Sequence, residues 1–432
     1  MSEGQPVQGV QGGVIARIVV VMALLPAVYA FERSAYYGMR AVLFLHMNRE
    51  LGMSPSDTSV VYKFVSIFGL ATVILGGLLC IVLRPAIVAA VGAAIGIAGY
   101  GAMAIASDKT VLWGALFVLG LGQGLFKPAL LAHAARELPF PRFHLRGAAF
   151  VALYAAINSG ALTGTSGGAL AAATSPSTSF AVSLVLAIVA FVICVVVMGA
   201  DLFVKVNAPR APTPPAGRVV LAGLLLCTAL LPYHAAQGVG ADIQFDALRS
   251  APSSFGMLQT LNPVIVFIVC IVAFLVLTGL HFTRVGDLSP WIVGAGLVVF
   301  ALGTAPLMMA TTAGSGSSTA LVGLSVVVMA IGEALVGPLG MSRVLGDIPP
   351  RFVGLAASVW LLFAGAASWA GSGMAAAWRA AAPVMFVGVV VVCLVIGVAV
   401  LALSRYALRN VYAPATEAAP ESGAEPEPVA EL

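Results

Sequence analysis

The sequence predicts an all-α integral membrane protein whose twelve transmembrane helices form two bundles of six. Of its 432 residues, 60% are hydrophobic and only 9% are charged, whereas about 25% of the residues of a soluble domain are charged. Apolar runs of about twenty residues, each long enough to cross a bilayer as a helix, recur along the chain. The strands of a membrane barrel would instead alternate apolar and polar residues over about ten positions, so the pattern excludes a barrel.

The apolar runs, taken in order, predict the twelve helices. The first run begins at Val14 and continues into charged residues without a small-residue cleavage site, so we expect this helix to remain in the mature protein. Short segments with charged residues or proline separate the other runs. The expected helices span residues 14–46, 58–83, 85–106, 110–135, 146–173, 177–204, 218–246, 255–281, 289–312, 318–346, 352–378 and 381–408.

A proline-rich segment divides these helices six against six. Residues 205–217 contain four prolines, which deny the backbone regular hydrogen bonds and indicate a semi-extended linker on the cytoplasmic side. The expected organisation is an N-terminal cytoplasmic segment (1–13), a six-helix bundle (14–204), the linker, a second six-helix bundle (218–408) and a tail (409–432). The tail is rich in Pro, Ala and Glu and cannot bury a core, so we expect it to be disordered.

The distribution of Lys and Arg predicts the orientation. With both termini inside, thirteen of these residues fall on the cytoplasmic side and four on the outer side, as the positive-inside rule requires. The net charge of +4 is spread thinly rather than clustered, so we expect no nucleic-acid partner. We predict a monomeric, multi-pass protein of the cell (inner) membrane, whose surroundings are lipid.

Six ionisable residues stand out at bilayer depth in the expected spans, where each costs roughly 2.5–3.5 kcal/mol and therefore indicates a function. They are Glu32, Arg33, Arg40, Lys63, Lys127 and Glu333. Lys63 lies near the outer end of its span, where a lysine extends its ammonium group to the interface. At 100° per residue, the tyrosines and charged residues of the first span, from Tyr29 to Arg40, lie within a sector about 140° wide. Such a stripe must face water or a partner helix, because lipid cannot hydrogen-bond to it.

The first half supplies mainly cations to these spans and the second half an anion. Lys127 precedes Pro128 in a glycine-rich helix, and Glu333 lies in a similar Gly/Pro segment. Two partners are open to Lys127: Glu32 in the empty protein, or a substrate carboxylate in the loaded one. A zwitterionic substrate suits this arrangement.

The sequence predicts neither an enzyme nor a metal-binding protein. All five cysteines lie inside apolar runs, which indicates packing rather than disulfides or metal ligation. The chain contains no His-x-x-x-Asp or Glu-x-x-His spacing and no phosphate-binding glycine loop. We therefore expect no catalytic residues, no metal and no cofactor.

Several segments in both halves resemble the proton-dependent oligopeptide transporters of the major facilitator superfamily. They are residues 31–40 (FERSAYYGMR), 124–128 (GLFKP), 146–160 (with Tyr154 and Asn158), 259–263 (QTLNP), 332–340 (with Glu333 and a Pro-Leu-Gly end) and Trp360. The resemblance implies the major facilitator fold and import of di- and tripeptides by proton symport, driven by the proton gradient, with alternating access.

The resemblance also implies roles for individual residues. Arg33, Arg40 and Lys127 would take the peptide carboxylate, and Asn158, Asn262 and Glu333 would take its amine and amide. Side-chain pockets would be lined by Tyr36, Tyr37, Tyr154 and Trp360. Proton coupling would involve Glu32, Lys127 and Glu333.

Departures from the family pattern leave alternatives open. Tyr29 stands where the first-helix signature has its first glutamate, and the acid expected beside Gln237 is missing. The intramembrane charges are then four positive to two negative, and unpaired buried cations are costly. One alternative is the same fold carrying another anionic or peptide-like molecule, with or without proton coupling. Others are His234 as a titrating substitute, a sensor without transport, and a structural membrane protein.

Overall fold

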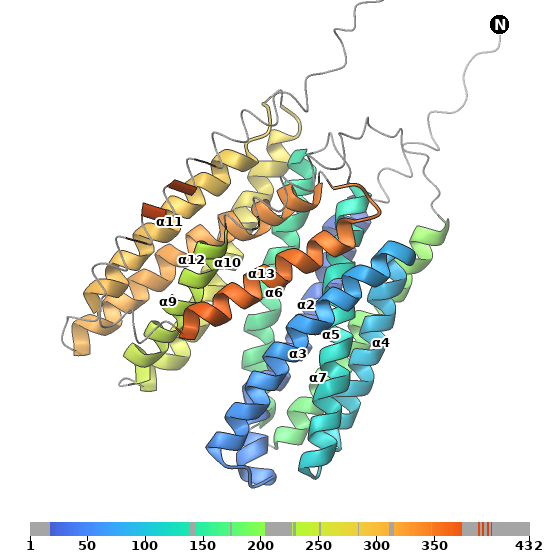
Figure 1. Ribbon diagram of the computed structural model, residues 1–432, viewed down its shortest axis with the longest axis vertical. Helices are drawn as coiled ribbons and strands as arrows, with labels where there is room; N and C mark the ends of the chain where they lie inside the picture. Colours follow the sequence, from blue (N-terminus) through green and yellow to red (C-terminus); the bar gives the residue numbers. More distant parts are fainter. Residues whose placement is uncertain are drawn as a thin grey trace, which may run out of the picture.

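The computed structural model describes residues 18–373, except 139–142, 173–174, 204–226, 228–229, 250–251, 284, 311–314 and 347, together with scattered positions between 388 and 399 (Figure 1). Within these ranges the chain is helical apart from short turns, and no strand occurs. The predicted segment 1–13, linker 205–217 and tail 409–432 lie outside the described residues, as do most of the last expected helix and the start of the seventh.

The described helices fall into two groups along the chain. The first group comprises α2 (Leu25–Leu45), with π-helical turns η1 (Val20–Leu24) and η2 (His46–Glu50) at its ends, α3 (Pro55–Val82), α4 (Pro85–Ala104), α5 (Lys109–Glu137), α6 (Phe143–Ala172) and α7 (Pro176–Phe203). The second comprises α9 (Leu231–Arg249), α10 (Pro252–Leu280), α11 (Ser289–Ala310), α12 (Ser315–Gly346) and α13 (Val353–Gly373). From α3 to α12, α9 excepted, the bounds agree with the expected helices within three residues.

Local sequence explains where these helices begin. Both α3 and α4 start with proline, whose fixed φ suits the first turn and whose missing N–H is not needed there. Ser54 caps α3 by accepting a hydrogen bond from the Asp57 N–H at 3.2 Å. Asp108 caps α5 in the same way, accepting from the Thr110 N–H at 2.7 Å.

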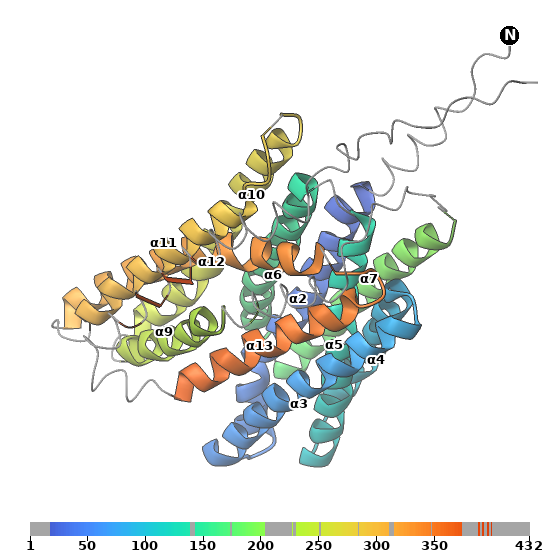
Figure 2. The same ribbon diagram turned by 45° about the horizontal axis from the view of Figure 1, so that its top comes forward.

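Each group is a bundle of its own. In the first, α2 packs on α6 and α7, and α4 packs on α5 and α7; in the second, α11 packs on α12 and α9 on α13. The groups meet where α10 contacts α6 and α13 contacts α3. They converge toward the top of Figure 1 and diverge toward its bottom, and Figure 2 shows the same separation from another side. These two groups are called the first and second halves below.

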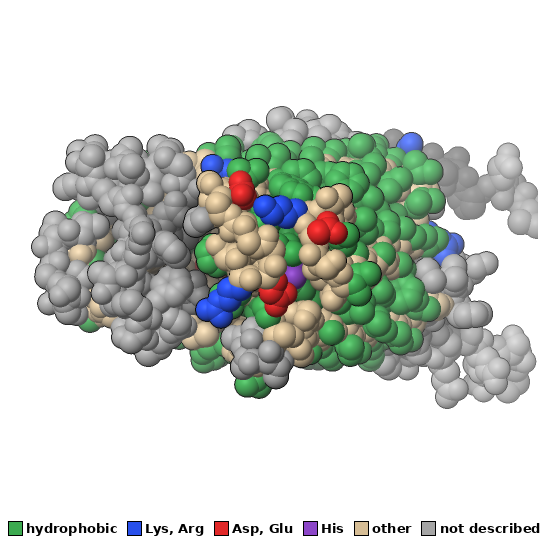
Figure 3. All heavy atoms as spheres, turned by 90° about the horizontal axis from the view of Figure 1, so that it is seen from below, with side chains coloured by type: hydrophobic (Ala, Val, Ile, Leu, Met, Phe, Trp, Pro, Cys, Tyr) green, Lys and Arg blue, Asp and Glu red, His purple; other side chains and the backbone are tan. Residues whose placement is uncertain are grey.

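The described helices have the length and composition of membrane spans. Nine of those that the structure describes are long and apolar enough to cross a bilayer. The charges Glu32, Arg33 and Arg40 set α2 apart from these nine. Seen from below, hydrophobic side chains cover much of the described surface, and a group of acidic and basic side chains lies near the middle of the view (Figure 3). The prediction of an all-α membrane protein is confirmed, whereas the count of twelve spans and the placement of both termini stay predictions.

A seam of small residues sets the rotation of α2. Three glycines of α6 at four-residue spacing face three small residues of α2 at the same spacing (Gly160, Gly164, Gly168; Ala30, Ser34, Gly38). A Cβ at Gly160 would lie 2.6 Å from the Ala30 carbonyl oxygen, so the backbones are as close as glycine allows. Ser34 Oγ also lies 2.8 Å from Thr163 Oγ1. Because this face of α2 is held against α6, the remaining polar residues of the stripe turn elsewhere.

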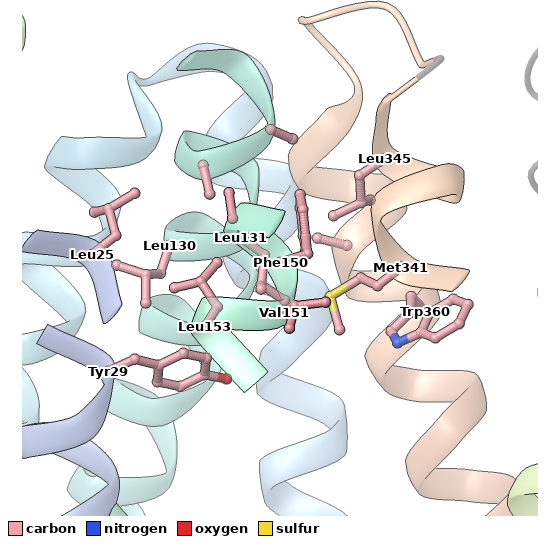
Figure 4. Close-up of a cluster of buried hydrophobic side chains, with 14 of the residues drawn as sticks. Leu25, Tyr29, Leu130, Leu131, Phe150, Val151, Leu153, Met341, Leu345 and Trp360 are labelled. Carbon is pink, nitrogen blue, oxygen red and sulfur yellow. The ribbon is translucent and has the colours of Figure 1, made fainter. Parts of the chain in front are cut away.

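One apolar cluster runs through both halves. It includes Leu25 and Tyr29 of α2, Leu130 of α5, Phe150 of α6 and Met341 of α12, and reaches Trp360 of α13 (Figure 4). Cys80, Cys194, Cys227 and Cys270 are free and buried, and all four belong to the same cluster. The prediction that the cysteines pack in the apolar core is confirmed for these four, and Cys393 lies outside the described residues.

Polar contacts join the halves at the end where α6 and α13 begin, which is the predicted cytoplasmic end. The buried Arg146 guanidinium donates to the Gly346 carbonyl oxygen at 3.2 Å, so that α6 meets the C-terminus of α12. Ser358 Oγ of α13 donates to the Val73 carbonyl oxygen of α3 at 2.7 Å. The structure therefore shows the halves closed together at this end.

Candidate functional site

Three buried polar side chains form a closed network between α2 and α5. Arg33 donates twice to Glu32, from Nε to Oε2 at 2.6 Å and from Nη2 to Oε1 at 2.8 Å. The Gln123 amide links the two, because its oxygen accepts from Arg33 and its nitrogen donates to Glu32. All three side chains are buried, and a buried ion pair is tolerated when such additional hydrogen bonds satisfy it. The protein itself therefore neutralises the Arg33 charge.

The expected pair between Lys127 and Glu32 is wrong for this structure. Glu32 is occupied by Arg33 and Gln123, and none of the ion pairs among the described residues involves Lys127. The Lys127 side chain is only half-buried. Its ammonium group lies 5.5 Å from the centre of the Tyr36 ring, a distance at which the ring quadrupole attracts a cation. Lys127 is thus a cation without a carboxylate partner in the part of the chain described.

The cations Arg33, Arg40 and Lys127 form the basic side of the site, and Tyr36 lies among them. The Arg33 guanidinium carbon lies 4.7 Å from its ring centre. Arg40 lies one helical turn beyond Tyr36 on the same face of α2 and acts electrostatically on it. Tyr37 packs edge-on against Tyr36, with ring centres 5.5 Å apart. The polar stripe predicted from helical spacing is therefore one connected surface.

Tyr29 takes the place of the missing acid without replacing its charge. Its buried ring packs edge-on against Phe126 at 6.1 Å, and the Arg33 guanidinium lies 5.7 Å from its centre. The ring offers Arg33 a cation–π contact. A carboxylate here would have neutralised a second cation.

The acidic side of the site is built by three helices around Glu333. Tyr154 of α6 donates its hydroxyl to Oε1 at 2.7 Å, and Asn262 of α10 donates its amide to Oε2 at 3.2 Å. Gln237 of α9 also interacts with this carboxylate. Tyr154 belongs to the first half, so Glu333 is shared by both halves. Arg33 and Arg40 on the one side and Glu333 on the other all act electrostatically on Tyr37.

His234 contacts the acidic side of the site through Gln237, and Trp360 packs against His234. His234 Nδ1 lies 3.1 Å from Gln237 Oε1, and its ring packs edge-on against Trp360 at 5.7 Å. Because the Gln237 oxygen can only accept, this hydrogen bond places the proton on Nδ1. Trp360 is 4% exposed, within the apolar cluster. The pocket-lining role expected of Trp360 stays a prediction.

Asn158 contacts the site only through its own helix. Its amide donates to the Tyr154 carbonyl oxygen at 2.9 Å, one turn earlier in α6, and the side chain is buried. Its expected contact with the peptide backbone stays a prediction.

Two glutamines of the site were not among the expected residues. Gln123 precedes Lys127 by four positions, and Gln237 lies between Ala236 and Gly238 in α9. A polar side chain one turn from an intramembrane lysine shares its face, so the spacing to Lys127 was the available signal for Gln123. Gln237 had no comparable signal, because the carboxylate that it contacts comes from α12.

The comparisons with known proteins agree with this architecture. The profile described as "Major Facilitator Superfamily" matches residues 22–372, which is most of the chain. The chain belongs to the Major Facilitator Superfamily. Proteins of this superfamily place a substrate site at the interface of two repeated halves, and Tyr36 of the first half and Glu333 of the second lie on the two sides of that interface here.

Matches with individual members of the superfamily point to peptide transporters. Over 150 residues the chain is 33% identical to dipeptide and tripeptide permease A of Proteus mirabilis, covering 32% of this chain and 28% of that one. It is 29% identical over 140 residues to peptide transporter 3 of Caenorhabditis elegans, covering 30% and 20%. The chain thus spans less than a third of the length of these relatives.

Solved structures match nearly the whole chain in fold. A peptide transporter in complex with alafosfalin has a TM-score of 0.60 at 19% identity, over 91% of this chain and 96% of the other. A structure from work on proton-dependent oligopeptide transporters has a TM-score of 0.55 at 19% identity, over 90% and 99%. The predicted fold and the resemblance to this family are both confirmed.

Proposed function

We propose that this protein imports di- and tripeptides by proton symport, with alternating access of the two halves. The proposal extends to this chain the substrates named for the relatives, and it places the protein in the cell (inner) membrane as a monomer. Protons and short peptides are its partners, the proton gradient drives it without a cofactor, and the substrate is moved rather than altered.

One observation carries the proposal: opposite charges stand on opposite halves. Lys127 of α5 has no carboxylate partner among the described residues, and Glu333 of α12 is held by neutral donors alone. A short peptide carries a carboxylate at one end and an ammonium group at the other. Its binding would join the halves, because each end satisfies a charge on a different half.

The remaining residues suit recognition of what all short peptides share. Asn262 and Gln237 surround the Glu333 carboxylate with amide groups, which pair with either an amine or a peptide bond. A proton on Glu333 would remove the attraction for the peptide ammonium group. A proton and the peptide ammonium group therefore compete at Glu333 itself, so the proton carried together with the peptide must bind elsewhere, and Glu32 and Lys127 are the candidates.

The test is uptake of labelled dialanine into proteoliposomes, with and without an inward proton gradient. We expect accumulation only with the gradient, and its loss in both Lys127→Ala and Glu333→Gln. Lys63→Ala is the matched control, because Lys63 is an exposed lysine near the start of α3. Equilibration without accumulation would contradict proton coupling, and no uptake by folded protein would contradict peptide transport itself.

A further inference from the structure

The surroundings of Tyr36 contain two positive charges that the described residues do not neutralise. Three cations lie near Tyr36: Arg33 at 4.7 Å and Lys127 at 5.5 Å from the ring, and Arg40 one helical turn further along the same face of α2. Glu32 neutralises Arg33 through a two-pronged ion pair. The ion pairs among the described residues include neither Lys127 nor Arg40. Lys127, Arg40 and Tyr36 together are called the Tyr36 site below.

Tyr29 is the residue that leaves this charge uncompensated. It lies one turn before Arg33 on the same face, and its ring is 5.7 Å from the guanidinium. The ring attracts a cation but contributes no negative charge. Glu333, the other carboxylate that the described residues bring near the interface, is engaged by Tyr154 and Asn262 on the other side of the site.

The carboxylate of a neutral dipeptide would neutralise only one charge of the Tyr36 site. A second carboxylate on the C-terminal residue would lie next to the first, within reach of the other cation. Arg40 is exposed and Lys127 half-buried, so both can turn toward a ligand. The attraction is appreciable at such a partly buried site, because the screening by water is incomplete there.

We infer that this transporter prefers peptides whose C-terminal residue is acidic, with Lys127 and Arg40 as the residues that determine the preference. The inference rests on the proposed function, since it concerns the same site. It predicts selection by position as well as by charge: an acidic side chain on the first residue would extend toward Glu333 and gain nothing.

The test is binding of four dipeptides to the purified full-length protein by isothermal titration calorimetry. Ala-Glu and Ala-Gln have nearly the same shape and differ in charge, whereas Glu-Ala and Gln-Ala place the same difference on the first residue. We expect Ala-Glu to bind about tenfold more tightly than Ala-Gln, or ~1.4 kcal/mol, and Glu-Ala to show no advantage over Gln-Ala. The advantage of Ala-Glu should shrink as salt concentration rises.

Variants at Tyr29 test whether the absence of a negative charge at this position causes the preference for an acidic C-terminal residue. Tyr29→Glu supplies the absent negative charge and should lower the ratio of Ala-Glu to Ala-Gln affinity toward one. Tyr29→Gln has the shape of glutamate without its charge and should keep the ratio. Arg40→Gln, at an exposed position where folding is not at risk, should also lower the ratio.

Three results would overturn the inference or the cause given for it, each in a distinguishable way. Equal affinity of the wild type for Ala-Glu and Ala-Gln would overturn it while leaving peptide binding intact. Failure of all four dipeptides to bind would overturn the inference and the proposed function together. An equal loss of ratio in Tyr29→Gln and Tyr29→Glu would assign the preference to shape and not to the missing charge.

Discussion

The hydroxyl of Tyr154, on α6 of the first half, donates a 2.7 Å hydrogen bond to the Glu333 carboxylate, on α12 of the second half. The Tyr154 ring also lies against Gly337, where an added Cβ would approach Cζ to 3.2 Å. A helix of one half thus holds the acidic residue of the other. Any rearrangement that separates α6 from α12 must release this carboxylate, so the position of the halves and the state of Glu333 are coupled.

Tyr154→Phe should weaken both stability and transport. The substitution removes one donor from a buried carboxylate, and a hydrogen bond to a charged group contributes about 1.5–3 kcal/mol. We expect a lower thermal unfolding midpoint in detergent and a severalfold lower rate of peptide uptake.

Tyr100→Phe is the matched control for this substitution. Tyr100 is buried in the first half, and its hydroxyl has no hydrogen-bond partner among the described residues. Removing an unsatisfied buried hydroxyl should leave stability unchanged or raise it. Equal effects of Tyr154→Phe and Tyr100→Phe would mean that the hydrogen bond across the halves contributes nothing.

Gln123→Met should destabilise the network of Glu32 and Arg33. Methionine preserves most of the side-chain volume but leaves the carboxylate and the guanidinium each without one partner. An unsatisfied buried group costs about 1–3 kcal/mol, so we expect a thermal unfolding midpoint lower by several degrees. Gln244→Met is the control, since the described Gln244 contact is one N–H···S approach of 3.8 Å to Met329. A midpoint as high as that of the control would contradict the structural role of Gln123.

Gly92→Ala and Gly96→Ala, one turn apart on α4, should change the stability of the protein in opposite directions: Gly92→Ala should lower it and Gly96→Ala should raise it. A Cβ at Gly92 would lie 2.6 Å from the Phe126 nitrogen of α5, whereas one at Gly96 would meet nothing within 4 Å. Overpacking against a backbone costs about 1–3 kcal/mol, while alanine in place of glycine favours a helix by up to about 1 kcal/mol. Thermal unfolding of the two variants checks this, and a stabilised Gly92→Ala would show that α4 and α5 are not so closely packed.

Arg146→Gln should open the end of the molecule where α6 and α13 begin. Arg146 is 2% exposed and links α6 to the Gly346 carbonyl oxygen at the C-terminus of α12, a place that favours a positive charge. Cys80, 1% exposed, packs against Gly354 at the same end. In a background where Cys80 is the only cysteine, a maleimide should label the variant severalfold faster than the parent protein.

Arg343→Gln is the control for Arg146→Gln, because it removes a positive charge at the same end from an ion pair that lies within the second half. Arg343 pairs with Asp287 at 2.5 Å, and both residues belong to the second half. Its loss should leave labelling of Cys80 nearly unchanged. Equal acceleration in the two variants would remove the special role of Arg146.

The sequence determined the helices and the family. Apolar runs of membrane-spanning length dictate helices because lipid leaves backbone groups no other hydrogen-bonding partner, and proline marks where several begin. The charged stripe of α2 follows from the 100° spacing of its residues, so that Arg33, Tyr36 and Arg40 were expected on one face. The motif at residues 31–40 indicated the family before any contact was known.

Only the tertiary structure decided which charge pairs with which. The sequence alone allows Glu32 to pair either with Arg33 or with a lysine on another helix. The place that α5 gives Gln123 decides which of the two pairs forms. Tyr154 and Glu333 are 179 positions apart, and no periodicity relates them. Pairing energies at such sites depend on distance and solvent exposure over a few ångströms, and these are set by how helices pack, not by the order of residues along them.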